Sequence, residues 1–110
     1  MTPVQACWMV FGDGDPAEQA AGLSHGDRVR AFEEAFQAVE DFHDYSVQEL
    51  HRALAWMGLL LEASNDDPAR LHGDDPMRVY LRLHRLFLDH HDHGVCEKAQ
   101  RLMHRLAPEV

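Results

Sequence analysis

The sequence predicts an all-α fold, a compact bundle of four to five helices that forms a single domain over residues 1–110. Apolar residues recur at helical spacing along most of the chain, whereas the alternation typical of strands is nearly absent. Helix-start signals, in which Ser, Thr or Asp stands just before Pro or three residues before Glu or Gln, occur repeatedly. With 45% hydrophobic residues, the chain is long enough to enclose one core.

The N-terminal segment, residues 2–23, is expected to hold short helices. Thr2-Pro3 followed by Gln5 predicts an N-cap, a proline in the first turn and a partial capping box. Val4–Phe11 is short and apolar, so a buried strand is the alternative there. Asp15-Pro16 repeats the start signal before the segment ends.

Two core helices follow, at about 25–43 and 46–63. Ser24 is a suitable N-cap for the first, whose apolar residues lie on one face while acidic residues occupy the other. Ser46 and Glu49 form a complete capping box for the second. The apolar arc of helix 46–63 is wider, which predicts a central position in the bundle.

The pattern DDP-x-R-[LV] occurs at 66–71 and again at 74–79, and each copy is a helix start with Asp as N-cap. The first start is expected to stop at Gly73. The second begins a helix at 76–93, which Gly94 would end as a C′ glycine. A last helix is predicted at 95–106.

Charge and composition restrict the partners of this chain. Ten basic against nineteen acidic side chains give a net charge of −9, which would repel nucleic acid. We therefore expect another protein as partner, one with a basic or amphipathic surface. The N-terminus lacks the basic region of a signal peptide, and no apolar run is long enough to span a membrane. With only two cysteines, the sequence predicts a cytoplasmic protein.

The stretch LDHHDHGV, residues 88–95, is dense in potential metal ligands. Asp89, His90 and His93 have spacings that bring side chains to one helix face, so a metal site here is one alternative. The residues also stand at the predicted end of helix 76–93, where donor side chains interact favourably with free carbonyl groups. We favour this structural interpretation, and expect neither a bound metal nor a cofactor.

No pattern on the chain indicates catalysis. Cys7 has no recognisable activating group nearby in sequence, and FGDGDP lacks the lysine of a phosphate-binding loop. A small enzyme with a helical cavity around His84 or His91 remains a second alternative.

Helix 76–93 carries more apolar residues than contact with one core requires, together with a stripe of arginines at i, i+4 and i+7. Aromatic residues and arginine are enriched at protein interfaces. The interface is predicted to comprise Trp8, Phe11, Trp56, Leu59, Arg78, Tyr80, Arg82, Leu83, Arg85 and Leu86. Two alternatives stay open: the apolar residues all fill the core, and the arginines lie against the acidic face of helix 25–43.

These observations together predict a non-enzymatic protein that binds and restrains another protein, of the anti-activator, chaperone or immunity type. We also expect it to form a homodimer. A histidine-rich metal-binding or metal-sensing protein is the main alternative.

Overall fold

The computed structural model describes residues 1–67, 69–72 and 76–107, and within these ranges the chain is all-α, without a strand. The predicted helical bundle is confirmed. The long helices are α1 (Pro3–Phe11), α3 (His25–Glu40), α4 (Val47–Ala63), α6 (Pro76–Asp89) and α7 (His93–Leu106). The short segments are α2 (Pro16–Ala21), the 3-10 helix η1 (Phe42–Asp44) and α5 (Ala69–His72).

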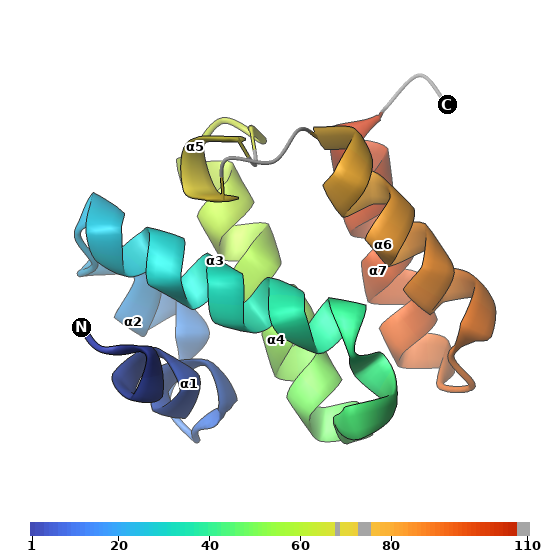
Figure 1. Ribbon diagram of the computed structural model, residues 1–110, viewed down its shortest axis with the longest axis horizontal. Helices are drawn as coiled ribbons and strands as arrows, with labels where there is room; N and C mark the ends of the chain where they lie inside the picture. The colour runs from blue at the N-terminus through green and yellow to red at the C-terminus, as the bar shows by residue number, and fades with distance from the viewer. Residues whose placement is uncertain (68, 73–75, 108–110) are drawn as a thin grey trace.

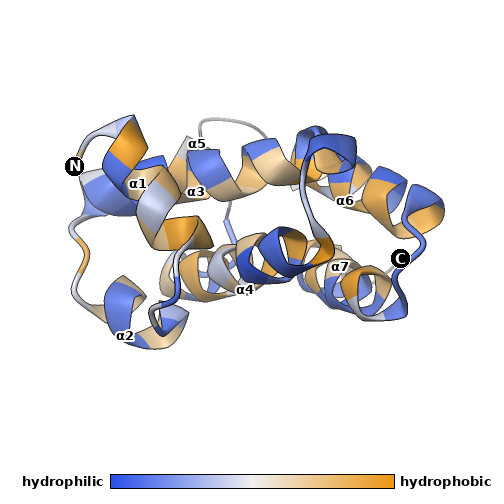
Figure 2. Ribbon diagram, turned by 90° about the horizontal axis from the view of Figure 1, so that it is seen from below, coloured by the Kyte–Doolittle hydropathy of each residue, from blue (hydrophilic) through white to orange (hydrophobic). Residues whose placement is uncertain are grey.

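The four longest helices form two layers (Figures 1 and 2). Helices α3 and α6 lie in one layer and cover α4 and α7 in the other, while α1 and α2 close one end of the molecule. Apolar side chains from both layers meet in one core. Its largest fully buried members include Phe32, Phe36, Leu50, Trp56, Met57, Leu60, Leu61, Leu83 and Leu86.

Local sequence signals account for most of the helix starts. The Thr2 side chain accepts the Gln5 N–H, and the Gln5 side chain accepts the Thr2 N–H, so this capping box is complete. Ser46 and Glu49 form the same reciprocal pair at the start of α4, as the sequence predicts. With its first turn capped in this way, the Val4–Phe11 segment is helical and is not a strand.

Arg52 of α4 fixes the far end of α1. Its guanidinium donates to the backbone carbonyls of Val10 at 2.8 Å, Gly14 at 2.9 Å and Met9 at 3.2 Å. The last carbonyls of a helix have no partner within the helix, so a fork of N–H donors satisfies several of them together. One side chain thereby attaches the N-terminal helix and the following turn to the central helix.

The predicted boundary between the last two helices is wrong. Helix α6 ends at Asp89 rather than at residue 93, and α7 begins at His93, so Gly94 lies in the first turn of α7 and is not a C′ glycine. The cause is Asp92, whose extended backbone and side-chain bond to the Val95 N–H make it the N-cap of α7.

Two smaller differences concern other helix ends. Helix α3 stops at Glu40, three residues before the predicted end, because the chain turns at Asp41 and buries Phe42 in η1. The first DDP copy does lead into a short helix, α5. Its predicted stop at Gly73 and the second Asp N-cap, residue 75, lie outside the described residues.

Candidate functional site

Helix α6 is apolar on two opposite sides. Val79, Leu83 and Leu86 are fully buried in the core. Three other large side chains, spaced at i, i+4 and i+11 on the opposite side, remain exposed: Met77 at 59%, Leu81 at 54% and Leu88 at 63%. We call these three residues the outer stripe of α6. An exposed apolar row of this kind on a well-packed helix is a candidate protein contact.

Several residues predicted for the interface lie in the core instead. Leu83, Leu86 and Trp56 have no exposed surface, so they are not available to contact another molecule in this conformation. The Trp56 indole nitrogen has no hydrogen-bond partner within the described part of the chain. These side chains support the fold because each contributes a large buried apolar surface.

The other predicted apolar contacts divide between surface and core. Trp8 is 72% exposed on α1, at the opposite end of the molecule from α6. Phe11 and Tyr80 are partly buried and pack against the core. Leu59 is partly exposed and lines a groove beside α7. The structure therefore does not bring the predicted residues together into one surface.

The outer stripe was not singled out from the sequence. Its residues alternate with the buried ones, so periodicity alone shows two apolar rows without telling which faces the core. Arg78, Arg82 and Arg85 separate the two rows on the helix surface, but their position does not indicate which row is buried. The two rows are similar in size and hydrophobicity, with Met, Leu and Leu in the outer stripe and Val, Leu and Leu in the buried row.

The arginine stripe flanks the outer stripe and contacts the chain itself. The guanidinium groups of Arg78 and Arg82 each lie 3.5 Å from Oε2 of Glu40, at the end of α3. Arg85 lies 3.9 Å from the Asp89 carboxylate and 5.9 Å from the centre of the Phe42 ring. Arg78 and Arg82 therefore lie as one of the two alternatives from the sequence predicted, with their charges against helix 25–43. Such partly exposed pairs contribute about 1 kcal/mol or less each to stability.

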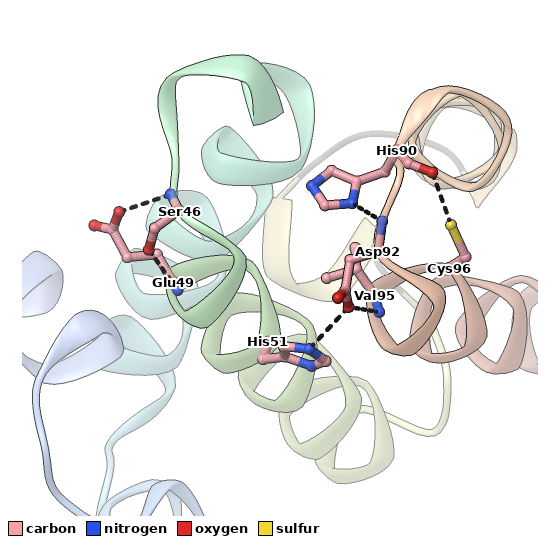
Figure 3. Close-up of polar contacts among 7 residues, drawn as sticks. All are labelled: Ser46, Glu49, His51, His90, Asp92, Val95 and Cys96. Atoms are coloured by element: carbon pink, nitrogen blue, oxygen red, sulfur yellow. Dashed lines mark hydrogen bonds and ion pairs between the residues drawn. The ribbon is translucent and has the colours of Figure 1, made fainter.

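The histidine-rich turn between α6 and α7 is a network of hydrogen bonds (Figure 3). The Asp92 N–H donates to Nδ1 of His90 at 3.0 Å. The Asp92 carboxylate accepts the Val95 N–H at 3.0 Å and lies 3.3 Å from Nε2 of His51, which reaches across from α4. These bonds connect the start of α7 to both neighbouring helices.

The surroundings of His90 and Asp92 shift the pKa values of both groups. Burial lowers the pKa of His90, and the neighbouring His91 lowers it further. The Val95 N–H holds the pKa of the Asp92 carboxyl below its usual value, with His51 adding to the effect. The contacts of the turn therefore favour the neutral form of His90 and the ionised form of Asp92.

The two cysteines have different surroundings. Burial raises the pKa of Cys7, and the carboxylates of Glu34 and Glu49 raise it further, which disfavours the nucleophilic thiolate. The Cys96 thiol donates to the carbonyls of His90 at 3.3 Å and Phe87 at 3.4 Å (Figure 3 shows the first of these). Neither cysteine forms a disulfide.

The spacing argument for a metal at Asp89, His90 and His93 does not apply to this structure. It requires the three side chains to share one helix, but Asp89 ends α6 and His93 begins α7. His90 also uses Nδ1 to accept the Asp92 N–H. Within residues 1–67, 69–72 and 76–107, no three His, Cys, Asp or Glu side chains are grouped so that they could hold a metal ion.

The histidines proposed for an enzymatic cavity lie beside small depressions. His84 lines one of about 200 Å³ between α6 and α7, with Tyr80 and His104. His91 lines another of about 180 Å³, with His43 and Phe42. Both volumes are below the roughly 300–1,000 Å³ typical of sites for small-molecule ligands.

Comparison with known proteins gives no relative: no family model, no curated protein and no solved structure matches the chain. Among the described helices, none has the length and apolar character that crossing a membrane requires.

Proposed function

We propose that this chain is a non-enzymatic protein-binding module that binds and restrains a partner protein through the outer stripe of α6. The observation that carries the proposal is the exposure, by more than half, of Met77, Leu81 and Leu88 on a helix whose opposite row is fully buried. Removing such side chains from water is favourable, and a partner that covers them supplies that free energy.

The surroundings of the stripe fit an amphipathic partner surface. Met77 and Leu81, together with Arg78 and Arg82, line a shallow groove of about 330 Å³. An apolar side chain of the partner fits between the two aliphatic residues, while a polar or acidic rim on the partner meets the arginines. The net charge of −9 disfavours nucleic acid as the partner.

The acidic composition and the two free cysteines support a regulatory inhibitor, chaperone or immunity protein acting in the cytoplasm. A homodimer would use the same outer stripe, because an isologous contact pairs a patch with its own copy. Measurements on the purified chain separate self-association from capture of a different protein.

The test compares Leu81→Glu with Val4→Glu. Leu81 is 54% exposed and Val4 is 56% exposed, but Val4 lies on α1, away from α6. Each protein is immobilised and exposed to an extract of its native host, and its mass in solution is measured by sedimentation equilibrium. We expect helicity to be unchanged in both variants, since neither position is in the core.

Leu81→Glu should lose the captured protein, or the dimer, while Val4→Glu and the wild type retain it. Loss of an apolar anchor at an interface costs about 2 kcal/mol or more, equivalent to roughly 30-fold in affinity. If both variants bind and assemble like the wild type, the outer stripe is an ordinary exposed surface and the proposal is wrong.

A further inference from the structure

A second apolar groove, distinct from the outer stripe of α6, lies between α4 and α7, which run side by side in one layer (Figure 2). Its volume is about 360 Å³, slightly more than the 330 Å³ of the groove at Met77 and Leu81. Leu54, Leu59 and Leu102 line it with aliphatic surface. It shares no lining residue with the groove at Met77 and Leu81.

Gly58 opens this groove in the middle of α4. A Cβ atom there would lie 3.6 Å from both Nη1 of Arg105 and Cδ2 of Leu102, which is ordinary van der Waals contact. The packing therefore leaves room for alanine, although glycine is among the poorest residues inside a helix. The absent side chain leaves open space between the helices.

The rim of the groove on α7 is cationic. Lys98, Arg101 and Arg105 follow one another at i, i+3 and i+7 along the edge, in a chain whose net charge is −9. Arg105 is held in place by the Gly58 carbonyl and the Asp66 carboxylate, and Arg101 by Glu97 on its own helix. Lys98 has no ion pair within the described residues. The opposite edge of the groove, on α4, carries one lining carboxylate, Glu62, so the cationic character belongs to the α7 side.

We propose that this groove binds an amphipathic helix of a partner protein, with acidic residues along the side of its apolar face that meets α7. The aliphatic floor receives the apolar side chains, as in other helix-in-groove complexes. The cationic rim selects for carboxylates and against amines at the partner positions that meet α7, since juxtaposed like charges are strongly unfavourable. The groove would therefore recognise both the apolar face and the charge of the partner helix.

A second copy of the chain is a poor occupant for this groove. The outer stripe of α6 is flanked by Arg78, Arg82 and Arg85, so it would place cations against the cationic rim. The free apolar residues of α1, Val4 and Trp8, stand on a helix without any charged side chain. The acidic helix α3 uses its apolar side in the core.

The test uses two synthetic helical peptides of the same length, with leucines at i, i+4, i+7 and i+11. One carries glutamates along one side of the leucines, and the other carries lysines at the same positions. Binding to the full chain is measured by fluorescence anisotropy at low and high salt. We expect the glutamate peptide to bind at least about tenfold more tightly than the lysine peptide, and to weaken as salt screens the rim.

Variants of the chain assign the binding to the groove. Arg101→Glu should weaken the glutamate peptide about tenfold, whereas Arg30→Glu, the same charge change at an exposed position of α3, should alter it far less. Gly58→Leu fills the groove and should abolish binding. Leu81→Glu should bind the peptide like the wild type, which separates this proposal from the function proposed for α6.

Equal affinity for the two peptides, no binding of either, or equal effects of Arg101→Glu and Arg30→Glu would each overturn the proposal. A dimer in solution that Arg101→Glu dissociates would assign the groove to a second copy, and would overturn it as well. Circular dichroism of each variant checks the fold, and Arg101→Glu decides the outcome if Gly58→Leu fails to fold.

Discussion

A Cβ atom on Gly94 would lie 2.9 Å from Cε1 of His51 and 3.2 Å from the Asp92 carboxylate. Gly94 therefore lies against the His51 imidazole. That imidazole extends from α4 to the Asp92 carboxylate at the start of α7 (Figure 3). The glycine that resembles a helix stop in the sequence instead makes room for a contact between two helices.

The first prediction concerns this contact. Alanine is favoured over glycine inside a helix by about 1 kcal/mol, but at position 94 its methyl group must displace His51. We expect Gly94→Ala to stabilise the protein by about 1 kcal/mol in a His51→Ala background and by clearly less in the wild type. Urea denaturation of the four proteins in this double-mutant cycle measures the difference. Equal effects in the two backgrounds would show that His51 does not restrict position 94.

The second prediction concerns pH. The folded state lowers the pKa of His90, chiefly through burial, and its Nδ1 must stay unprotonated to accept the Asp92 N–H. As pH falls from 6.5 toward the lower folded pKa, the unfolded chain binds the proton first, so the free energy of unfolding decreases. The neighbouring His91, His43 and His51 oppose protonation of His90, and Asp92 favours it.

His90→Asn keeps an acceptor near the position of Nδ1 but does not titrate. We expect the free energy of unfolding of this variant to vary less steeply between pH 7 and pH 5 than that of the wild type. The exposed His25, at the start of α3, supplies the control substitution His25→Asn. An unchanged slope in His90→Asn would contradict the prediction. The contribution of Asp92 is lost in a separate range, below its ordinary pKa of 3.8.

The third prediction concerns Arg52, whose three hydrogen bonds hold the end of α1. A lysine keeps the charge but presents one ammonium group, which cannot span three carbonyls as the planar guanidinium does. We expect Arg52→Lys to lower the free energy of unfolding by about 2 kcal/mol and to speed hydrogen exchange of the α1 amides. Arg30→Lys, on the exposed face of α3, should change neither quantity.

Local signals in the sequence predicted the parts of the fold that depend on near neighbours. The caps at Thr2, Ser24 and Ser46 each involve a side chain and a backbone N–H three residues away, so their pattern is visible in the sequence. The end of α6 was mispredicted because Asp92 and Gly94 both carry boundary signals. Which of them acts depends also on His51, from a helix distant in sequence.

The candidate interface was predicted less well for a related reason. Hydropathy periodicity shows that α6 has two apolar rows, but only packing against α7 and α3 determines which row is buried. Trp56 was assigned to the surface because of its residue type, yet it fills the core. The groove at Gly58 was not foreseen, since its walls belong to helices about 40 residues apart in the chain.

The last prediction separates the two rows of α6. Leu83 is fully buried and Leu81 is 54% exposed, although the two residues differ by only two positions on the same helix. Replacing Leu83 by alanine leaves a cavity in the close-packed core, which should cost about 3 kcal/mol of stability. Leu81→Ala removes a side chain from the surface of the isolated chain, so its effect should stay within about 0.5 kcal/mol. Thermal and urea denaturation of dilute protein measure both changes.

Two other outcomes are distinguishable. If the loss of stability caused by Leu81→Ala grows with protein concentration, α6 is covered by a second copy. Equal losses at the two positions, independent of concentration, would mean that both rows of α6 are buried within one chain, and the outer stripe would lose its role as a binding surface.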